Sequence, residues 1–299
     1  MSKALLVTGA GGHLGRRVVE ILLAQKAGPI IATTRNPEKL ADLRAQGVDV
    51  RHADFDAPGS LVDAFAGAGR VLLVSTDALD RPGRRLEQQR NAVAAAARAG
   101  VDHLVYTSVT KAGPSSPLLV TPDHYGTERA IEETSLGYTI LRNNLYTDLL
   151  LGAIPRAVAT GQLVAAAGEG ATAYVTREDC ARAAAAALAS SFTGRRVLEI
   201  TGPASLTQSD LARIASDLSG KPITYVSIPR AALEAGMQQA GLPASVAAIY
   251  ASFDEGISIG ALDVVTSAVA DLTGTPPEDV RSFLSRHESA LRAPPAPAH

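Results

Sequence analysis

Three glycines near the start of the chain are spaced three residues apart. Gly9, Gly12 and Gly15 follow the apolar run Leu5 to Val7 and precede the helical pattern Arg16 to Ala27. Glycine permits a tight turn, lets backbone N–H groups approach an anion and allows a helix to lie close to a strand. The stretch predicts a strand, a turn and a helix that bind the pyrophosphate of a dinucleotide. The residues expected at this turn are Gly9, Ala10, Gly11, Gly12, His13, Leu14 and Gly15.

Arg35 stands where the second predicted strand ends, a position that separates the two nicotinamide dinucleotides. The strand runs from Pro29 to Thr34 and is followed by a helical pattern from Glu38 to Gln46. Enzymes that use NAD commonly place a carboxylate at this strand end, whereas a cation accommodates the 2′-phosphate of NADP. No carboxylate stands beside Arg35, and Lys39 lies one turn into the helix. The pattern predicts NADP(H); an ordinary surface arginine is the other interpretation.

Two further strand ends carry polar side chains. Ser75 and Thr76 end the strand predicted from Arg70, and Asn143 follows the strand Tyr138 to Arg142. Because the carboxyl ends of the strands in a doubly wound sheet meet the cofactor, we expect Ser75 and Thr76 there. Serine, threonine and asparagine are also common where strands turn, so a purely structural role is the alternative.

Tyr125 and Arg129 lie four residues apart on the helix predicted from Asp123 to Ser135. Many short-chain reductases place Tyr-x-x-x-Lys here, where the lysine lowers the pKa of the tyrosine and the phenol donates a proton. Arginine is a delocalised cation and is not interchangeable with lysine. Tyr125 is therefore either a proton donor or a tyrosine that only lines the pocket or packs.

Apolar runs alternate with helical patterns along the first half of the chain. Strands are predicted at about 5–7, 29–34, 48–55, 70–76, 101–108 and 138–142. Strands at this spacing, separated by helices, form a parallel sheet with right-handed crossovers. The sequence thus predicts an α/β fold with a doubly wound parallel sheet (Rossmann fold) and a smaller mixed α/β C-terminal substrate domain.

The expected division of the chain follows from this alternation. Residues 1–153, with 161–190 contributing, would form the NADP(H)-binding domain. Residues 154–160 and 191–290 would form the smaller domain over the carboxyl ends of the strands, leaving a cleft for substrate. The last residues, 291–299, are rich in alanine and proline, and we expect them to be a disordered tail.

Composition argues against several classes of partner. The 299 residues carry a formal net charge of −2 without a basic stripe, which disfavours nucleic acid. Met1 to Lys3 run directly into the first predicted strand, and the apolar stretches are too short or too charged to span a membrane. The single cysteine, Cys180, excludes an intrachain disulfide and suits a reducing compartment. These observations predict a cytoplasmic protein, and the histidine spacing predicts no metal site.

Several segments together resemble one family, the NmrA-like atypical short-chain dehydrogenases/reductases. Within it, they are similar to the group of type 2 NAD(P)H:quinone oxidoreductases and triphenylmethane reductases. The matching segments are residues 7–15, 35–39, 106–108, 127–128, 138–143, 145–146 and the loop around 168–170. The resemblance implies that the glycine turn, Arg35, Ser75, Thr76, the segment from Asn143 through Leu145 to Tyr146, and the loop at Gly168 surround the cofactor. Members of the group generally lack the Tyr-x-x-x-Lys pair.

The resemblance also implies a reaction. A quinone or a cationic triarylmethane dye accepts hydride readily, so the protein need only position donor and acceptor and exclude water. We expect an NADPH-dependent oxidoreductase that transfers hydride directly to a quinone-like small-molecule electrophile, without flavin or metal. Asn143 and Asn144 would orient the nicotinamide or the acceptor, Tyr146 would form a pocket wall, and His124 would be a polar contact.

Two other functions fit the same cofactor fold. One is a carbonyl reductase that uses Tyr125 with Arg129 as its proton donor. The other is a regulatory protein that senses NADP(H) without turnover. A homodimer is a further expectation for either an enzyme or a sensor.

Overall fold

A seven-stranded parallel sheet forms the centre of the protein, for which residues 3–291 are described by a computed structural model. The strand order is β3-β2-β1-β4-β5-β6-β9, and every neighbouring pair is parallel. The strands are β1 (Ala4–Val7), β2 (Ile30–Thr34), β3 (Asp49–His52), β4 (Ala68–Leu73), β5 (His103–Val109), β6 (Gly137–Asn143) and β9 (Arg195–Ile200). A wholly parallel sheet requires helical crossovers, which the chain supplies between successive strands.

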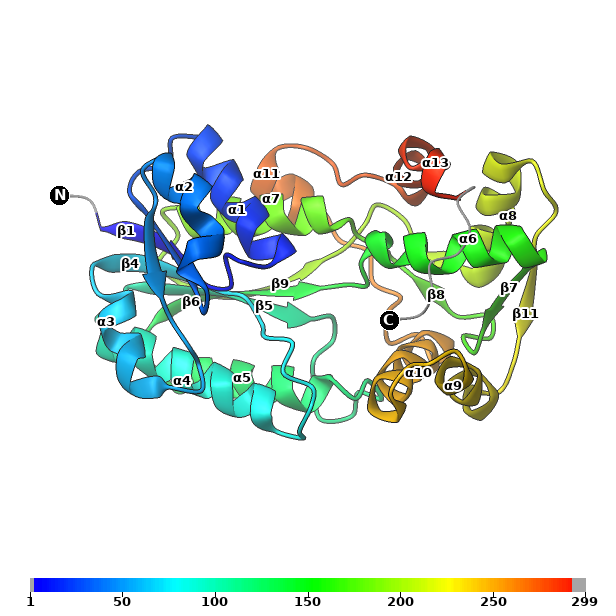
Figure 1. Ribbon diagram of the computed structural model, residues 1–299, viewed down its shortest axis with the longest axis horizontal. Helices are drawn as coiled ribbons and strands as arrows, with labels where there is room; N and C mark the ends of the chain where they lie inside the picture. The colour runs from blue at the N-terminus through cyan, green and yellow to red at the C-terminus, as the bar shows by residue number, and fades with distance from the viewer. Residues whose placement is uncertain (1–2, 292–299) are drawn as a thin grey trace.

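Helices cover both faces of this sheet (Figure 1). One face is covered by α1 (His13–Ala24), α7 (Arg177–Ala189) and α11 (Ala268–Thr273), with α2 (Ala41–Ala45) and the 3₁₀ turn η1 (Pro37–Leu40) at one end. The other face is covered by α3 (Leu61–Phe65), α4 (Arg84–Arg98) and α5 (Thr121–Glu132), with η2 (Pro58–Ser60) leading into α3.

Alternating side chains of the inner strands β2, β1, β4, β5 and β6 enter the two resulting cores. In β5, Val105 belongs to the core under α1 and α7, whereas Leu104 and Tyr106 belong to the core over α3 to α5. Leu5 and Leu6 of β1 divide in the same way. A strand buried on both faces reads as a continuous apolar run, which is why the sequence pattern predicts these strands.

The strand order reverses between β1 and β4. From β1 the chain moves outward to β2 and β3, and from β4 it moves the other way to β5, β6 and β9. The connections after β1 and β4 therefore separate, and a crevice opens at the carboxyl ends of these two strands. The amino ends of α1 and α4 lie at this edge.

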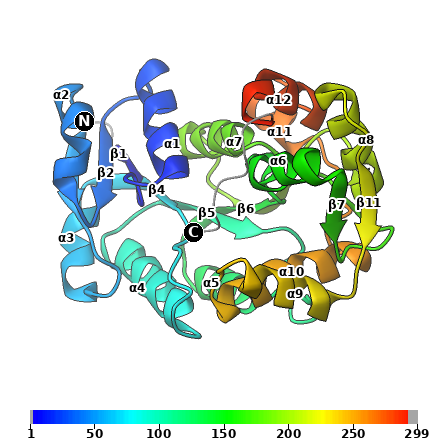
Figure 2. The same cartoon turned by 45° about the vertical axis from the view of Figure 1, so that its right-hand side comes forward.

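The remaining elements form a smaller group beside the sheet (Figure 2). Two short sheets, β7 with β11 and β8 with β10, lie among its helices. The elements are η3 (Thr147–Leu149), α6 (Leu150–Thr160), β7 (Gln162–Ala165), β8 (Ala171–Thr172), β10 (Leu206–Thr207), α8 (Gln208–Ser219), β11 (Thr224–Ser227), α9 (Arg230–Gln239), α10 (Ala244–Ser258), α12 (Val280–Arg286) and α13 (Glu288–Leu291). The β7–β11 pair lies between α6 and α8 on one side and α9 and α10 on the other.

The predicted fold class, a doubly wound parallel sheet with a smaller α/β part, is confirmed. The exact division into domains stays a prediction, but two strands belong to the other part of the molecule than the expected division assigns. β9 is expected in the smaller part and is instead the edge strand of the main sheet, paired with β6. β7 is expected with the main sheet and instead pairs with β11. Short edge strands carry little pattern that would reveal their partner.

The expected tail begins one residue too early. Leu291 is a buried residue of α13, because its side chain completes the core formed by α6, α8 and α12. Residues 292–299 lie outside the described residues. Between residues 3 and 291, no helix is long and apolar enough to cross a membrane.

Candidate active site

The glycine turn brings β1 and α1 into close contact. Gly9 has a φ of +61°, a conformation that favours glycine, and the N–H of Gly12 donates to its carbonyl at 2.9 Å. A Cβ on Gly15 would lie 2.5 Å from that same carbonyl oxygen. Gly15 therefore lets the first turn of α1 sit directly on the end of the strand.

The amino end of α1 offers uncapped backbone donors. Gly12 is its N-cap residue and has no side chain to accept from the first-turn N–H groups, and no acidic residue stands in that turn. Ala10 and Leu14 are buried and hold the turn to the protein, whereas Gly11 and His13 are exposed. Free N–H groups and the helix dipole at an open helix start bind phosphate.

Arg35 extends from the end of β2 beside this turn. Its side chain is exposed and makes no hydrogen bond or ion pair among the described residues. Lys39 is also exposed, in the 3₁₀ turn that follows. The hydroxyl of Thr34, the last residue of β2, accepts from the N–H of Asn36 at 3.2 Å and closes the bend in which Arg35 stands. Two exposed cations at this strand end suit a 2′-phosphate.

The loop after β4 contributes an unpaired hydroxyl. The N–H of Ser75 donates to the hydroxyl of Thr107 at 2.9 Å, which ties this loop to β5. The hydroxyl of Thr76 is buried and has no hydrogen-bond partner among the residues that the structure describes. Buried polar groups are normally paired, so this hydroxyl is free to bind a ligand.

Asn143 and Tyr146 meet at the end of β6. Asn143 donates from Nδ2 to the phenol oxygen of Tyr146 at 3.2 Å, and its Oδ1 is buried without a partner in the described part of the chain. Burial raises the pKa of Tyr146 above its ordinary value, so the phenol stays protonated at neutral pH. Arg177 lies 5.4 Å from the centre of the Tyr146 ring. The pair therefore presents one free acceptor, Oδ1, which could receive the carboxamide of a nicotinamide.

The neighbouring residues of this segment hold the chain in place. Asn144 donates from Nδ2 to the carbonyl of Leu262 at 3.0 Å and accepts from the N–H of Leu145 at 2.8 Å. Both ends of its amide are thus used within the protein, in contrast to Asn143. The Leu145 side chain packs between the two cores of the smaller group.

Gly168 lies in the loop between β7 and β8 with a φ of +53°. This loop is fixed to α10, because the N–H of Ala166 donates to the carboxylate of Asp254 at 2.7 Å. The role of Gly168 at the cofactor stays a prediction.

Tyr125 and Arg129 lie on a different face of α5 from its buried residues. The guanidinium of Arg129 is 5.3 Å from the Tyr125 ring and forms an ion pair with Glu132. The buried residues of the helix include His124 and Glu128. Within residues 3–291, Tyr125 has no hydrogen bond to any residue of the glycine turn or of the segment 143–146.

A buried hydrogen-bonded chain, which the sequence did not reveal, starts at Arg85 in the first turn of α4. Its Nη2 donates to His124 Nε2 at 2.7 Å, and His124 Nδ1 is 2.9 Å from the phenol oxygen of Tyr106. Tyr106 donates to Gln89 at 3.2 Å, and Gln89 donates to Thr127 at 3.0 Å. His124 was expected to be a polar contact at the site, and it is buried within this series of hydrogen bonds.

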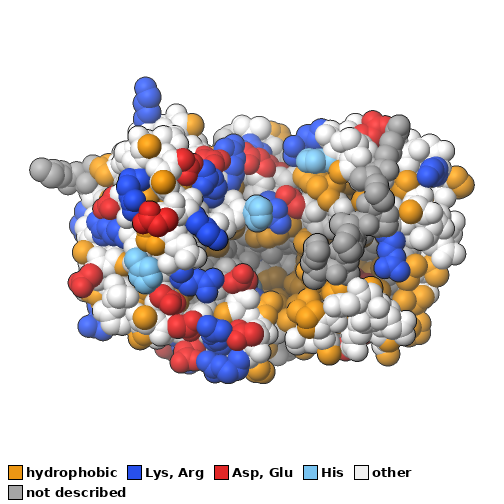
Figure 3. Space-filling model, in the orientation of Figure 1, with side chains coloured by type: hydrophobic (Ala, Val, Ile, Leu, Met, Phe, Trp, Pro, Cys, Tyr) orange, Lys and Arg blue, Asp and Glu red, His pale blue; other side chains and the backbone are white. Residues whose placement is uncertain are grey.

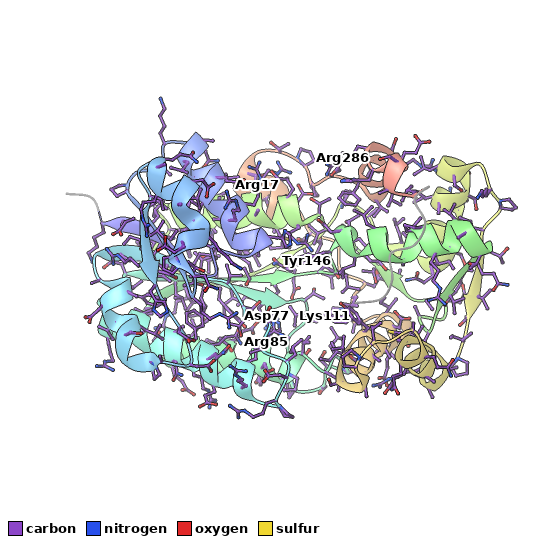
Figure 4. All side chains as sticks on the ribbon, in the orientation of Figure 1. Arg17, Asp77, Arg85, Lys111, Tyr146 and Arg286 are labelled. Atoms are coloured by element: carbon purple, nitrogen blue, oxygen red, sulfur yellow. The ribbon has the colours of Figure 1, made fainter. Side chains whose placement is uncertain are left out.

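The surface is hollowed between the sheet and the smaller group (Figure 3). Lys and Arg side chains border the recess toward the sheet, and hydrophobic side chains border it below. Asp77 and Arg85 face the space that Tyr146 borders from above and Lys111 from the side (Figure 4). The uncapped helix, the strand-end cations and the free polar atoms of Thr76 and Asn143 all lie at the carboxyl edge of the sheet, and together they fit a nicotinamide dinucleotide.

Fold and turn together define a dinucleotide-binding protein of the Rossmann type. A family model described as NAD(P)H-binding matches residues 9–191, and the chain belongs to this family. It is 36% identical over 273 residues to quinone oxidoreductase 2 of Escherichia coli, covering 91% of this chain and 94% of that protein.

Solved structures are similar along the whole chain. The NADPH complex of the NADPH-dependent quinone oxidoreductase from Escherichia coli has a TM-score of 0.88 and 35% identity, covering 96% of this chain and 99% of that one. Triphenylmethane reductase of Citrobacter sp. with NADP(H) has a TM-score of 0.87 and 34% identity, covering 94% and 99%. The chain is thus an NAD(P)H-dependent oxidoreductase of the NmrA-like group, and the predicted family and cofactor are confirmed.

Proposed function

We propose that the protein transfers hydride from NADPH directly to a quinone. The observation that carries this proposal is the similarity to an NADPH-dependent quinone oxidoreductase over almost the full length of both chains. The exposed Arg35, which has no carboxylate next to it in the sequence, and the exposed Lys39 support the choice of NADPH over NADH.

The cofactor supplies the hydride when it is bound, and the protein supplies the geometry. The amino end of α1 would hold the pyrophosphate, and Arg35 the 2′-phosphate. Asn143 would fix the nicotinamide through its free Oδ1, while its Nδ2 keeps the Tyr146 ring in place as a wall. Holding the two reactants in contact in a site shielded from water accounts for most of the acceleration expected in such a reaction.

The arrangement of α5 favours this mechanism over a carbonyl reductase. Tyr125 lies against Arg129, and Arg129 is paired with Glu132, so neither forms the tyrosine and lysine arrangement that proton donation to an alkoxide requires. A quinone needs no such donor, because the reduced product takes its proton from water.

The test is the oxidation of NADPH by the purified protein, followed by absorbance. The acceptors are benzoquinone, naphthoquinone, a triarylmethane dye and an aldehyde, each also measured with NADH. We expect fast, NADPH-selective turnover with the quinones and none with the aldehyde. Preferential turnover of the aldehyde would favour the carbonyl reductase. Cofactor binding without any turnover would favour the sensor.

The compartment and assembly belong to the same proposal. A cytoplasmic protein would have access to NADPH, and its buried Cys180 suits a reducing compartment. A homodimer stays a prediction that sedimentation would test.

A further inference from the structure

Arg85 is a buried cation without an ion pair. Only 7% of the residue is exposed, and no carboxylate forms a salt bridge with it among the described residues. Its Nη2 is bonded to His124, whereas its Nε is buried and has no partner within residues 3–291. Burial of an uncompensated charge is costly, and native proteins normally pair such groups.

The hydrogen bonds around Arg85 fix the neutral form of its neighbour. Arginine has only donors, so His124 Nε2 must accept and the proton resides on Nδ1, which donates to Tyr106. Burial and the nearby Arg85 charge lower the pKa of His124 well below its ordinary value. The side chains that are hydrogen-bonded in series to Arg85 are therefore neutral and do not cancel its positive charge.

The carboxylates nearest to Arg85 act on its charge only from a distance. Asp77 and Asp123 offset part of the charge, but neither forms an ion pair with Arg85 among the described residues. Tyr146 lies on the opposite side of the recess from Arg85 (Figure 4). Arg85 is thus held by α4 at the carboxyl edge of the sheet, beside the recess that Asp77 and Lys111 also border (Figure 4). We expect the acceptor to meet the nicotinamide in this recess.

We propose that Arg85 binds the oxygen of the acceptor and stabilises the negative charge that appears there on reduction. This inference rests on the proposed function. One hydride, carrying two electrons, converts a quinone into a hydroquinone monoanion and leaves NADP⁺, and water then supplies the remaining proton. A preorganised cationic donor in a site shielded from water stabilises such an oxyanion much more than water does.

The same charge selects between acceptors. A neutral quinone gains negative charge on reduction, so it is attracted more strongly to Arg85 in the transition state than before. A cationic triarylmethane dye begins positive and ends neutral, so Arg85 repels it at the start. The protein should therefore prefer acceptors that become anions.

The experiment compares Arg85→Met and Arg85→Lys with the unaltered protein. The readouts are kcat/KM for naphthoquinone and for a cationic triarylmethane dye, and calorimetric binding of the 2-hydroxy-1,4-naphthoquinone anion to the NADP⁺ complex. For Arg85→Met we expect a loss of about 10- to 100-fold with the quinone and in anion binding, and no loss with the dye. Arg85→Lys should show smaller losses than Arg85→Met in both quinone activity and anion binding, because it keeps the charge but not the forked geometry.

Arg81→Gln is the matched control. It removes one positive charge from an exposed side chain that pairs with Glu87 at the surface. We expect its kcat/KM values and anion binding to match those of the unaltered protein, and the NADPH dissociation constant to be the same in all variants. Equal losses of quinone and dye activity in Arg85→Met, with anion binding unchanged, would overturn the inference.

The two proposals fail in different ways. If the unaltered protein reduces no quinone, the proposed function is wrong, yet the anion-binding comparison still tests Arg85. If it reduces quinones and the anion binds equally to the unaltered protein and to Arg85→Met, the proposed function stands and the role of Arg85 is wrong. Should Arg85→Met fail to fold, Arg85→Lys carries the same comparison.

Discussion

Side chains at the carboxyl edge of the sheet differ in whether their polar atoms are already paired. Asn144 uses both ends of its amide to fix the backbone, whereas Asn143, one residue earlier, keeps Oδ1 free of any partner among the described residues. Thr76 keeps a free hydroxyl in the same way. Because an unpaired buried polar atom is costly, we predict that these two atoms, which lie at the carboxyl edge of the sheet, contact a bound molecule.

Arg35 should decide the choice between the two nicotinamide cofactors. A charge-assisted hydrogen bond to phosphate contributes roughly 1.5–3 kcal/mol. Arg35→Ala should therefore weaken NADPH binding by about ten- to a hundredfold and leave NADH binding nearly unchanged. Fluorescence titration of both cofactors measures this. Arg44→Ala, an exposed arginine on α2, is the control, and equal weakening of NADPH and NADH would contradict the assignment.

Tyr125 should be dispensable for quinone reduction. It lies against Arg129, has no hydrogen bond to the segment 143–146 in the described structure, and a quinone needs no proton donor from the protein. Tyr125→Phe should change kcat/KM for naphthoquinone by less than about twofold, since the hydroxyl that it removes lies away from the buried face of α5. A loss of a hundredfold or more would show that the phenol donates a proton.

Among single residues, the sequence reveals those that belong to a motif. It misses those whose role depends on being buried. Gly9, Arg35 and Asn143 stand at strand ends, so their positions could be read from the chain. Arg85 follows another arginine at the start of an alanine-rich helix, and nothing in that pattern tells which of the two is buried. Packing of α4 against α5 decides it, because Arg84 pairs with Asp56 and Asp80 at the surface while Arg85 turns inward.

Among the elements, the contact between β1 and α1 is the tightest constraint on the cofactor turn. The start of α1 must touch the end of the strand if its N–H groups are to reach a pyrophosphate. Gly15 makes this contact possible, since any Cβ would overlap the backbone of Gly9 and Thr8.

Gly15→Ala should therefore damage both stability and cofactor binding. The methyl group pushes α1 off β1, and overpacking of this kind costs typically about 1–3 kcal/mol in the free energy of unfolding. Urea unfolding and NADPH titration measure the two effects. Gly59→Ala is the control, because a Cβ there meets nothing within 4 Å. Unchanged stability and NADPH affinity in Gly15→Ala would contradict the geometry of the turn.

The sequence predicts the strands of the main sheet to within a few residues. For the inner strands β2, β1, β4, β5 and β6 the reason is that a short apolar run between two helical patterns is typical of a buried parallel strand. The edge strands β3 and β9 are more exposed, and their prediction depends on the regular alternation of strands and helices instead. The elements α6, β7, β8 and β10 were not predicted. Pro155 lies inside α6, which argues against a helix in the sequence, and β8 and β10 are two residues each.

For the molecule as a whole, the path of the chain between its elements is harder to predict from the sequence than the identity of the core residues. The chain leaves the sheet after β6, forms α6 and β7, and returns through α7 to add β9 at the edge. It leaves again and returns once more as α11, which packs on α7 and on β9. Such returns depend on contacts between segments far apart in sequence, which local patterns do not encode.

The stability of the whole molecule should fall as the pH is lowered below neutrality, because His103, like His124, is buried with a lowered pKa. The imidazole of His103 is buried at the start of β5, with Nε2 3.0 Å from the hydroxyl of Thr139 and no partner for Nδ1 within residues 3–291. Burial, with the nearby charges of Arg70 and Arg196, lowers its pKa from 6.5 to about 4. The unfolded chain therefore binds a proton more readily than the folded protein, and stability rises with pH in this range.

The contribution of His103 is fully present above about pH 6.5 and is lost progressively as the pH falls to about 4. The whole difference is on the order of 3 kcal/mol. Urea unfolding from pH 7.5 to 4.5 should show His103→Gln less stable than the unaltered protein at neutral pH, with the two curves converging in acid. His52→Gln, an exposed histidine at the end of β3, should follow the unaltered protein throughout. Parallel curves for His103→Gln would mean that His103 titrates as in the unfolded chain, and that its site beside Arg70 and Arg196 admits the charged imidazole.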